Sequence, residues 1–159
     1  MHTMTRLSAH DVADRGLRGR IRGVLDLLGR FPMALLELMF RLGVASVFFK
    51  SGLVKIQSWD STVALFAEEY KVPLLSPSTA AYLGTTAELV CPVLIALGLG
   101  ARLGAAALLG MTLVIQTFVY PENWAEHLIW ASLLAYVLTR GPGPISIDHF
   151  IARSWLHRD

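Results

Sequence analysis

Residues 33–55 read MALLELMFRLGVASVFFKSGLVK, an apolar run about as long as a helix that crosses the hydrocarbon core of a bilayer. The run nevertheless carries Glu37, Arg41 and Lys50, and it ends on Lys55. Ionisable side chains are costly in hydrocarbon, so they need protein partners. Glu37 and Arg41, four residues apart, share one helical face. Lys55 returns to roughly that face, whereas Lys50 points away, so one face of this helix is expected to contact protein.

The composition of the whole chain supports a membrane protein. The chain has 159 residues, of which 54% are hydrophobic and 16% charged, whereas soluble domains are about 25% charged. We predict an all-α, integral membrane four-helix bundle with short interfacial helices. The predicted domains are a basic segment at 1–31, the transmembrane domain at 32–140 and a tail at 141–159. The predicted spans are residues 33–55, 79–97, 102–120 and 124–138. No cleavable signal peptide is expected.

The distribution of Lys and Arg predicts the orientation of these spans. The N-terminal segment, the turn at 98–102 and the C-terminal tail are basic. The loop at 56–78 offers only Lys71, and the loop at 120–125 has no Lys or Arg but contains Glu122. The sequence therefore predicts that both termini are cytoplasmic.

Three segments outside the spans have helical patterns. Residues 1–31 are either a basic amphipathic helix on an anionic membrane surface or a disordered tail, and both interpretations stay open. Nucleic-acid binding is not expected, because acidic residues dilute the charge and no binding motif is present. Residues 59–70 carry a stripe predicted to lie flat at headgroup level: Trp59, Val63, Phe66 and Tyr70. Ser146 is expected to cap a short tail helix.

Two charged residues are expected to pair within the membrane. Counted at about 1.5 Å per residue from the cytoplasmic ends, Arg41 lies about 12 Å deep and Glu88 about 15 Å. An Arg41–Glu88 pair, with Glu37 one turn below, would neutralise groups that could not stand alone. Pro92 removes the N–H that would bond the carbonyl of Glu88, which leaves a second polar group to satisfy. A structural ion pair and a ligand site both remain open.

A second polar cluster is predicted toward the outer face. Its members are Lys50, Gln116, Tyr120, Glu126 and His127. These residues would shape a pocket for a quinone ring or a metal, although a histidine at a helix start is commonly a cap. Cys91 is the only cysteine, so an internal disulfide and a cysteine-built metal site are excluded. The methionines are too scattered to indicate copper, and no metal ligands are assigned.

Several motifs occur in a characteristic order over residues 33–150. They are Arg41-Leu42-Gly43, the run from Phe48 to Lys55, Glu88 followed by LGLGAR at 97–102, and GPG at 141–143 followed by SID at 146–148. Together they resemble the DoxX family. Residues 55–60, KIQSWD, and 69–73, EYKVP, resemble one branch of it, whose members are typically encoded beside maturation enzymes for copper-binding modified peptides.

This resemblance implies a four-helix protein of the bacterial inner membrane, linked in some relatives to quinone or thiol redox chemistry. The family has no agreed catalytic motif, so Arg41, Lys55 and Glu88 are candidates only. We expect a redox accessory subunit that binds a quinone, with soluble redox or peptide-maturation proteins as partners. The alternative is a non-enzymatic membrane partner in copper or oxidative-stress handling. A homodimer has no specific support, since the small residues from Gly100 to Gly110 also suit packing within one bundle.

Overall fold

The computed structural model describes residues 9–156, with side chains from 19 to 154. All regular elements in this part are helical, in agreement with the predicted all-α class. Their bounds are α1 Ala9–Gly29, α2 Met33–Gln57, α3 Trp59–Leu65, η1 Phe66–Tyr70, α4 Pro77–Leu97, α5 Ala101–Val114, η2 Ile115–Val119, η3 Pro121–Asn123, α6 Trp124–Arg140 and α7 Ile147–Leu156.

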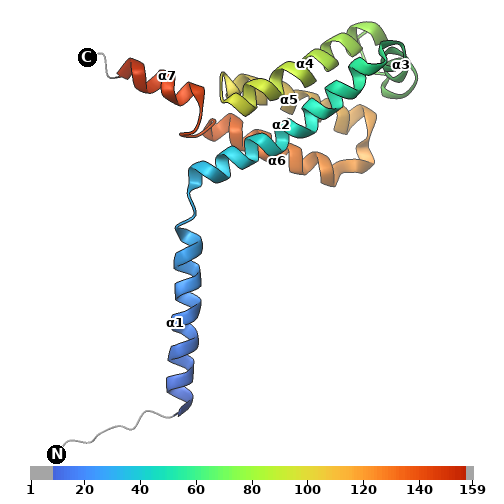
Figure 1. Cartoon of the computed structure of the whole chain (residues 1–159). Coiled ribbons are helices and arrows are strands. Elements are labelled where there is room, and N and C mark those ends of the chain that lie inside the picture. Colours follow the sequence, from blue (N-terminus) through green and yellow to red (C-terminus); the bar gives the residue numbers. More distant parts are fainter. Residues whose placement is uncertain (1–8, 157–159) are drawn as a thin grey trace, which may run out of the picture. The chain divides into compact units, whose positions relative to one another are not determined.

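The chain forms two units that meet at residue 33. The first contains α1, in which every described side chain is exposed, including the apolar Ile21, Val24 and Leu28. The second unit contains the four long helices α2, α4, α5 and α6, which run side by side (Figure 1). Helix α5 packs between α4 and α6.

The bundle core contains small and branched residues from all four helices. Its members are Val44, Ala45, Phe48, Ile95, Ala101, Ala105, Leu108, Leu134 and Val137, each at most 5% exposed. At Gly104 a Cβ would lie 3.1 Å from the Cys91 carbonyl oxygen, so the small residue lets α5 approach α4 closely. Gly104, one of the small residues from Gly100 to Gly110, therefore serves helix packing within the bundle.

The lengths and compositions of the helices agree with a membrane bundle. Helix α4 and the continuous segment Ala101–Val119 are each long and apolar enough to cross a membrane by themselves. Helix α2 is longer but carries four ionisable side chains, and α6 has 17 residues, about 25 Å of helix. Because α2 and α6 pack with the two apolar helices, the predicted four-helix membrane bundle is confirmed.

Helix α3 and η1 form a cap over one end of the bundle. Phe66 is 6% exposed and packs with Ala80 and Ala81 of α4, and the Trp59 and Tyr82 rings lie 4.4 Å apart. The predicted aromatic stripe therefore packs on α4, and its position at headgroup level stays a prediction. The hydrophobic effect favours this packing, because the start of α4 offers a complementary apolar face.

At the opposite end, α7 docks against the α4–α5 turn. Gly98 adopts φ +67°, a left-handed conformation that ends α4 and is favourable for glycine. Its carbonyl accepts a hydrogen bond from the Asp148 backbone N–H at 2.9 Å, while the Asp148 carboxylate accepts from the backbone N–H groups of Gly100 and Ala101. The Ser146 hydroxyl accepts from the His149 N–H, so the predicted cap of the tail helix is confirmed.

Candidate functional site

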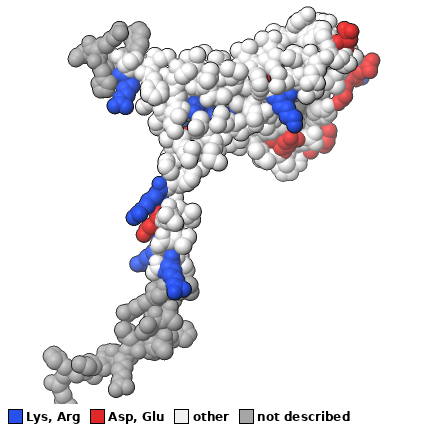
Figure 2. All heavy atoms as spheres, in the orientation of Figure 1, with Lys and Arg blue, Asp and Glu red and all other residues white. Residues whose placement is uncertain are grey.

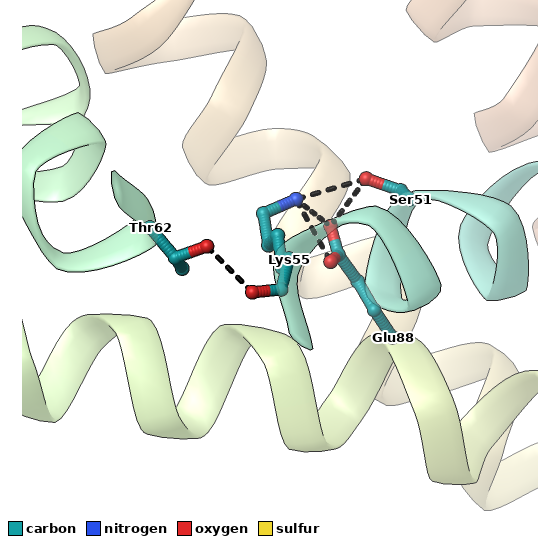
Figure 3. Close-up of polar contacts among 4 residues, drawn as sticks. All are labelled: Ser51, Lys55, Thr62 and Glu88. Carbon is teal, nitrogen blue, oxygen red and sulfur yellow. Dashed lines mark hydrogen bonds and ion pairs between the residues drawn. The ribbon is translucent and has the colours of Figure 1, made fainter. Parts of the chain in front are cut away.

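A buried ion pair joins α2 to α4. Lys55 Nζ lies 2.8 Å from Glu88 Oε2 and donates to Oε1 at 2.9 Å. Ser51 accepts from Lys55 at 2.8 Å and donates to Glu88 at 3.1 Å, which closes a triangle of polar contacts (Figure 3). Lys55 is 8% exposed and Glu88 is 5% exposed. Two charges this deeply buried are tolerable because each is paired and further hydrogen-bonded.

The surrounding elements fix this pair in place. The Thr62 hydroxyl of α3 donates to the Lys55 carbonyl at 2.7 Å, which ties the cap to the end of α2. The Tyr70 ring centre of η1 lies 6.0 Å from Lys55 Nζ, within reach of a cation–π attraction. At Gly52 a Cβ would lie 2.9 Å from the Leu89 side chain, so this glycine allows α2 to approach α4 next to Glu88.

The predicted Arg41–Glu88 pair is wrong. Arg41, 1% exposed, donates from Nη2 to the carbonyl of Ile145, and its Nη1 lies against Gly98, where a Cβ would come within 2.2 Å. Arg41 therefore connects α2 to the α4–α5 turn and to the loop before α7.

The error has a geometric cause. Counting depth from the helix ends assumed that Met33 and Leu97 lie at one level. In the structure it is Arg41 that lies level with the Gly98 turn, so the first two turns of α2 extend beyond the end of α4. Lys55, which lies further along α2, is therefore the residue that contacts Glu88.

Glu37 is also separate from this ion pair. Its Oε1 accepts a hydrogen bond from the Tyr136 hydroxyl at 3.1 Å. Its Oε2 lies against Gly143, where a Cβ would come within 2.1 Å. Glu37 and Arg41 thus share one helical face, as predicted, and both contact the segment that leads into α7.

Two cavities meet at Glu88. A polar cavity of about 200 Å³ is lined by residues of α2, η1, α4 and α6 and of the segment between α5 and α6, among them Ser51, Lys55, Tyr120, Glu126 and His127. An apolar cavity of about 280 Å³ lies between η1, α4 and the α5–η2 segment. Tyr70, Glu88 and Ile115 line both cavities. Leu83 and Val114 of the apolar cavity are exposed on the outer surface of the helices, where the bilayer is expected.

The polar cavity combines members of both predicted clusters. Lys55 and Glu88 come from the intramembrane set, and Tyr120, Glu126 and His127 come from the outer set. Lys50 does not take part, because it is exposed on the other face of α2, in agreement with the expected direction of its side chain.

His127 is held in one orientation by Gln116. The Gln116 amide donates to the Pro121 carbonyl at 2.8 Å, which turns its oxygen toward His127 Nδ1 at 2.7 Å. In this arrangement the Nδ1–H of His127 donates to the Gln116 oxygen. His127 is 4% exposed and its ring lies tilted against Trp130, with the ring centres 5.2 Å apart, so it is a buried, oriented imidazole at the wall of the polar cavity.

A tyrosine pair connects the polar cavity to the surface. The Tyr120 hydroxyl donates to the exposed Glu69 carboxylate, and the rings of Tyr70 and Tyr120 meet edge to face at 5.8 Å. The bond to Glu69, together with burial, raises the pKa of Tyr120 above its ordinary value. Burial, together with the charge of Glu88, raises the pKa of Tyr70. Both hydroxyls are therefore neutral donors at physiological pH.

Two polar side chains of the site, Ser51 and Tyr70, belong to neither of the predicted polar clusters. Ser51 precedes Lys55 by four residues, about one helical turn, a spacing that indicates contact but is common in any helix. Tyr70 belongs to the predicted aromatic stripe, and the sequence carries no signal that its ring lies near Lys55. Its position depends on the turn between η1 and α4.

Comparisons with known proteins give one match. The DoxX family model matches residues 36–121, more than half of the chain, including both members of the ion pair and most of the cavity walls. Neither a curated protein nor a solved structure matches the chain. The chain belongs to the DoxX family of membrane proteins.

Proposed function

We propose that this protein is a redox-associated accessory subunit that binds a quinone in the apolar cavity. The main observation in support is that the apolar and the polar cavity share Tyr70 and Glu88 as lining residues. Ligand sites are typically apolar with a few convergent polar groups, which matches a cavity where these two residues supply the polar side chains. The ring would enter from the bilayer, and its oxygens would meet the phenol and the carboxylate.

The polar groups that line the polar cavity beside Glu88 support a role in proton transfer. A quinol releases protons when it is oxidised, so its site benefits from an acceptor connected to water. Glu88 borders the polar cavity, which also contains the His127 ring and Tyr120, and Tyr120 is bonded to the exposed Glu69. The electrons would pass to a partner protein, and this chain would supply the quinone and its protonation environment.

Purification tests this proposal directly. The full chain is extracted in mild detergent and analysed by mass spectrometry for bound quinone, and binding of a short-chain ubiquinone and menaquinone is then titrated. Ala87→Phe places a ring in the apolar cavity and should abolish binding. Ala107→Phe, at an exposed position on α5 away from the cavity, is the matched control. Quinone binding that is absent, or unchanged by Ala87→Phe, would contradict the proposal.

A second candidate function is that of a non-enzymatic partner in copper or oxidative-stress handling. The supporting observation is an acidic surface at the end of the bundle that carries α3 (Figure 2). Its exposed members are Asp60, Glu68, Glu69, Glu122 and Glu126. Such a surface suits a basic protein partner or a cationic cargo. Crosslinked partners that disappear on neutralising these residues, without any bound quinone, would favour this function.

We further propose a location in the bacterial inner membrane with both termini in the cytoplasm. The acidic end would then face outward, and the end with Arg102 and Arg140 would face the cytoplasm, in accord with the positive-inside rule. Reporter fusions after Val72 and Glu122 should report the outer side, and a fusion after Asp159 the cytoplasm. A cytoplasmic signal at Glu122 would refute this orientation.

A further inference from the structure

A basic cavity lies at the end of the bundle opposite the ion pair, outside the site described above. It has a volume of about 400 Å³ and is lined by Arg102, Arg140, His149 and the glycine-proline loop at 141–144. Arg102 is the second residue of α5, and Arg140 is the last residue of α6. Because α5 and α6 are packed antiparallel neighbours, these two ends meet.

The loop at 141–144 brings the backbone of Gly141 next to the side chain of Arg102. Gly141 adopts φ +87°, and a Cβ there would lie 3.3 Å from Arg102 Nε and Nη2. The guanidinium of Arg102, an exposed residue, therefore lies close to the backbone of Gly141. A guanidinium presents its donors as a planar fork, the geometry that matches phosphate oxygens.

The positive charge of this cavity is not cancelled by its neighbours. Asp148 is the acidic residue in the lining, and both of its carboxylate oxygens accept backbone N–H groups at the start of α5. Glu37 lies behind Gly143 and accepts the Tyr136 hydroxyl. Within the described part of the chain, neither Arg102 nor Arg140 forms an ion pair, so both remain available to an anion.

The cavity lies at one end of a segment long enough to span the hydrocarbon core of a bilayer. The segment Ala101–Val119 spans about 28 Å of helix, close to the thickness of a hydrocarbon core, so Arg102 lies at its boundary. Beside the cavity, α7 exposes Ile147, Phe150 and Ile151, spaced on one helical face. A phosphate between the arginines would leave acyl chains next to this apolar face.

We propose that this cavity binds the phosphate of an anionic glycerophospholipid, with α7 lying against the acyl chains. Basic pockets at the ends of membrane helices are suited to such headgroups. The site is independent of the proposed quinone site, because it shares no lining residue with either of the cavities that meet at Glu88.

Native mass spectrometry of the full chain in neutral detergent tests this proposal. Phosphatidylglycerol should bind in preference to phosphatidylcholine, and removal of each arginine should weaken its binding about fivefold. The test variants are Arg102→Gln and Arg140→Gln, singly and together. Arg153→Gln, which removes an exposed arginine of α7 outside the cavity, should bind as the unmodified chain does. The pair Arg102→Lys and Arg140→Lys keeps the charge but loses the planar fork, so its binding should lie between that of the unmodified chain and that of the double Gln variant.

Three results would overturn the proposal. The first is equal binding of the two lipids by the unmodified chain, which needs no variant to fold. The second is an equal loss with Arg153→Gln, which would indicate diffuse charge rather than a site. The third is full competition by glycerol phosphate at equal concentration, which would show that the cavity takes a soluble phosphate and that the acyl chains contribute nothing.

Discussion

Glu88→Ala is expected to destabilise the bundle by about 3–5 kcal/mol, because it leaves the ammonium group of Lys55 buried without its counter-charge. Lys55 Nζ has three close polar partners, two of which are the carboxylate oxygens of Glu88, at 2.8 and 2.9 Å. The remaining partner, the Ser51 hydroxyl at 2.8 Å, is neutral and cannot replace the lost charge. Lys55→Ala should cost a similar amount, because it strands the carboxylate.

The double variant Lys55→Met with Glu88→Met tests whether these two residues stabilise the fold through their mutual contact or independently of each other. Apolar side chains of similar length remove both charges, so much of the lost stability should return. In a double-mutant cycle the coupling energy should be about 2 kcal/mol or more, whereas residues that do not touch add within about 0.5 kcal/mol. Free energies of unfolding come from titration with a denaturing detergent in mixed micelles.

Two controls make the cycle decisive. Lys50→Met removes an exposed lysine from the same helix and should have little effect. A cycle between Arg41 and Glu88 should be additive, because the structure directs Arg41 to the Ile145 carbonyl. Additivity for Lys55 and Glu88, or strong coupling of Glu88 to Arg41, would refute the assignment of partners. If the double variant folds but no longer binds quinone, the pair belongs to the ligand site.

Three further predictions follow from single contacts. Gly52→Ala should destabilise the bundle by about 1–3 kcal/mol by overpacking α2 against α4, whereas Gly43→Ala, with no atom within 4 Å of the new Cβ, should be nearly neutral in the same unfolding assay. Glu69→Gln should lower the pKa of Tyr120 toward its ordinary value of 10.0, measured by ultraviolet titration of tyrosinate; an unchanged pKa would exclude the hydrogen bond. Gly98→Ala should lower the melting temperature, because its φ is +67° and the new Cβ would come within 2.2 Å of a buried guanidinium; unaltered melting would contradict this packing.

The sequence alone predicted the fold class and the helix positions closely. The predicted first span, residues 33–55, corresponds to α2 at Met33–Gln57, and the second, 79–97, to α4 at Pro77–Leu97. Apolar run length, Pro and Gly signals and charge position are local properties, so they can be read along the chain. Helical periodicity also predicted that Arg41 and Lys55 face protein while Lys50 faces away, as their burial shows.

Only the tertiary structure decided which charged groups meet. The relative shift of α2 and α4 along their axes depends on how Arg41 contacts the Gly98 turn and on the α7 loop, some hundred residues away in the chain. This axial register makes Lys55 the partner of Glu88 in place of Arg41, which lies about four turns earlier on α2, and no local pattern encodes it. The cap formed by α3 and η1 likewise brings Tyr70 over Lys55, and so creates two cavities with Glu88 in a shared wall. Helical period is a property of each segment, whereas axial register is set by the packing of all segments together.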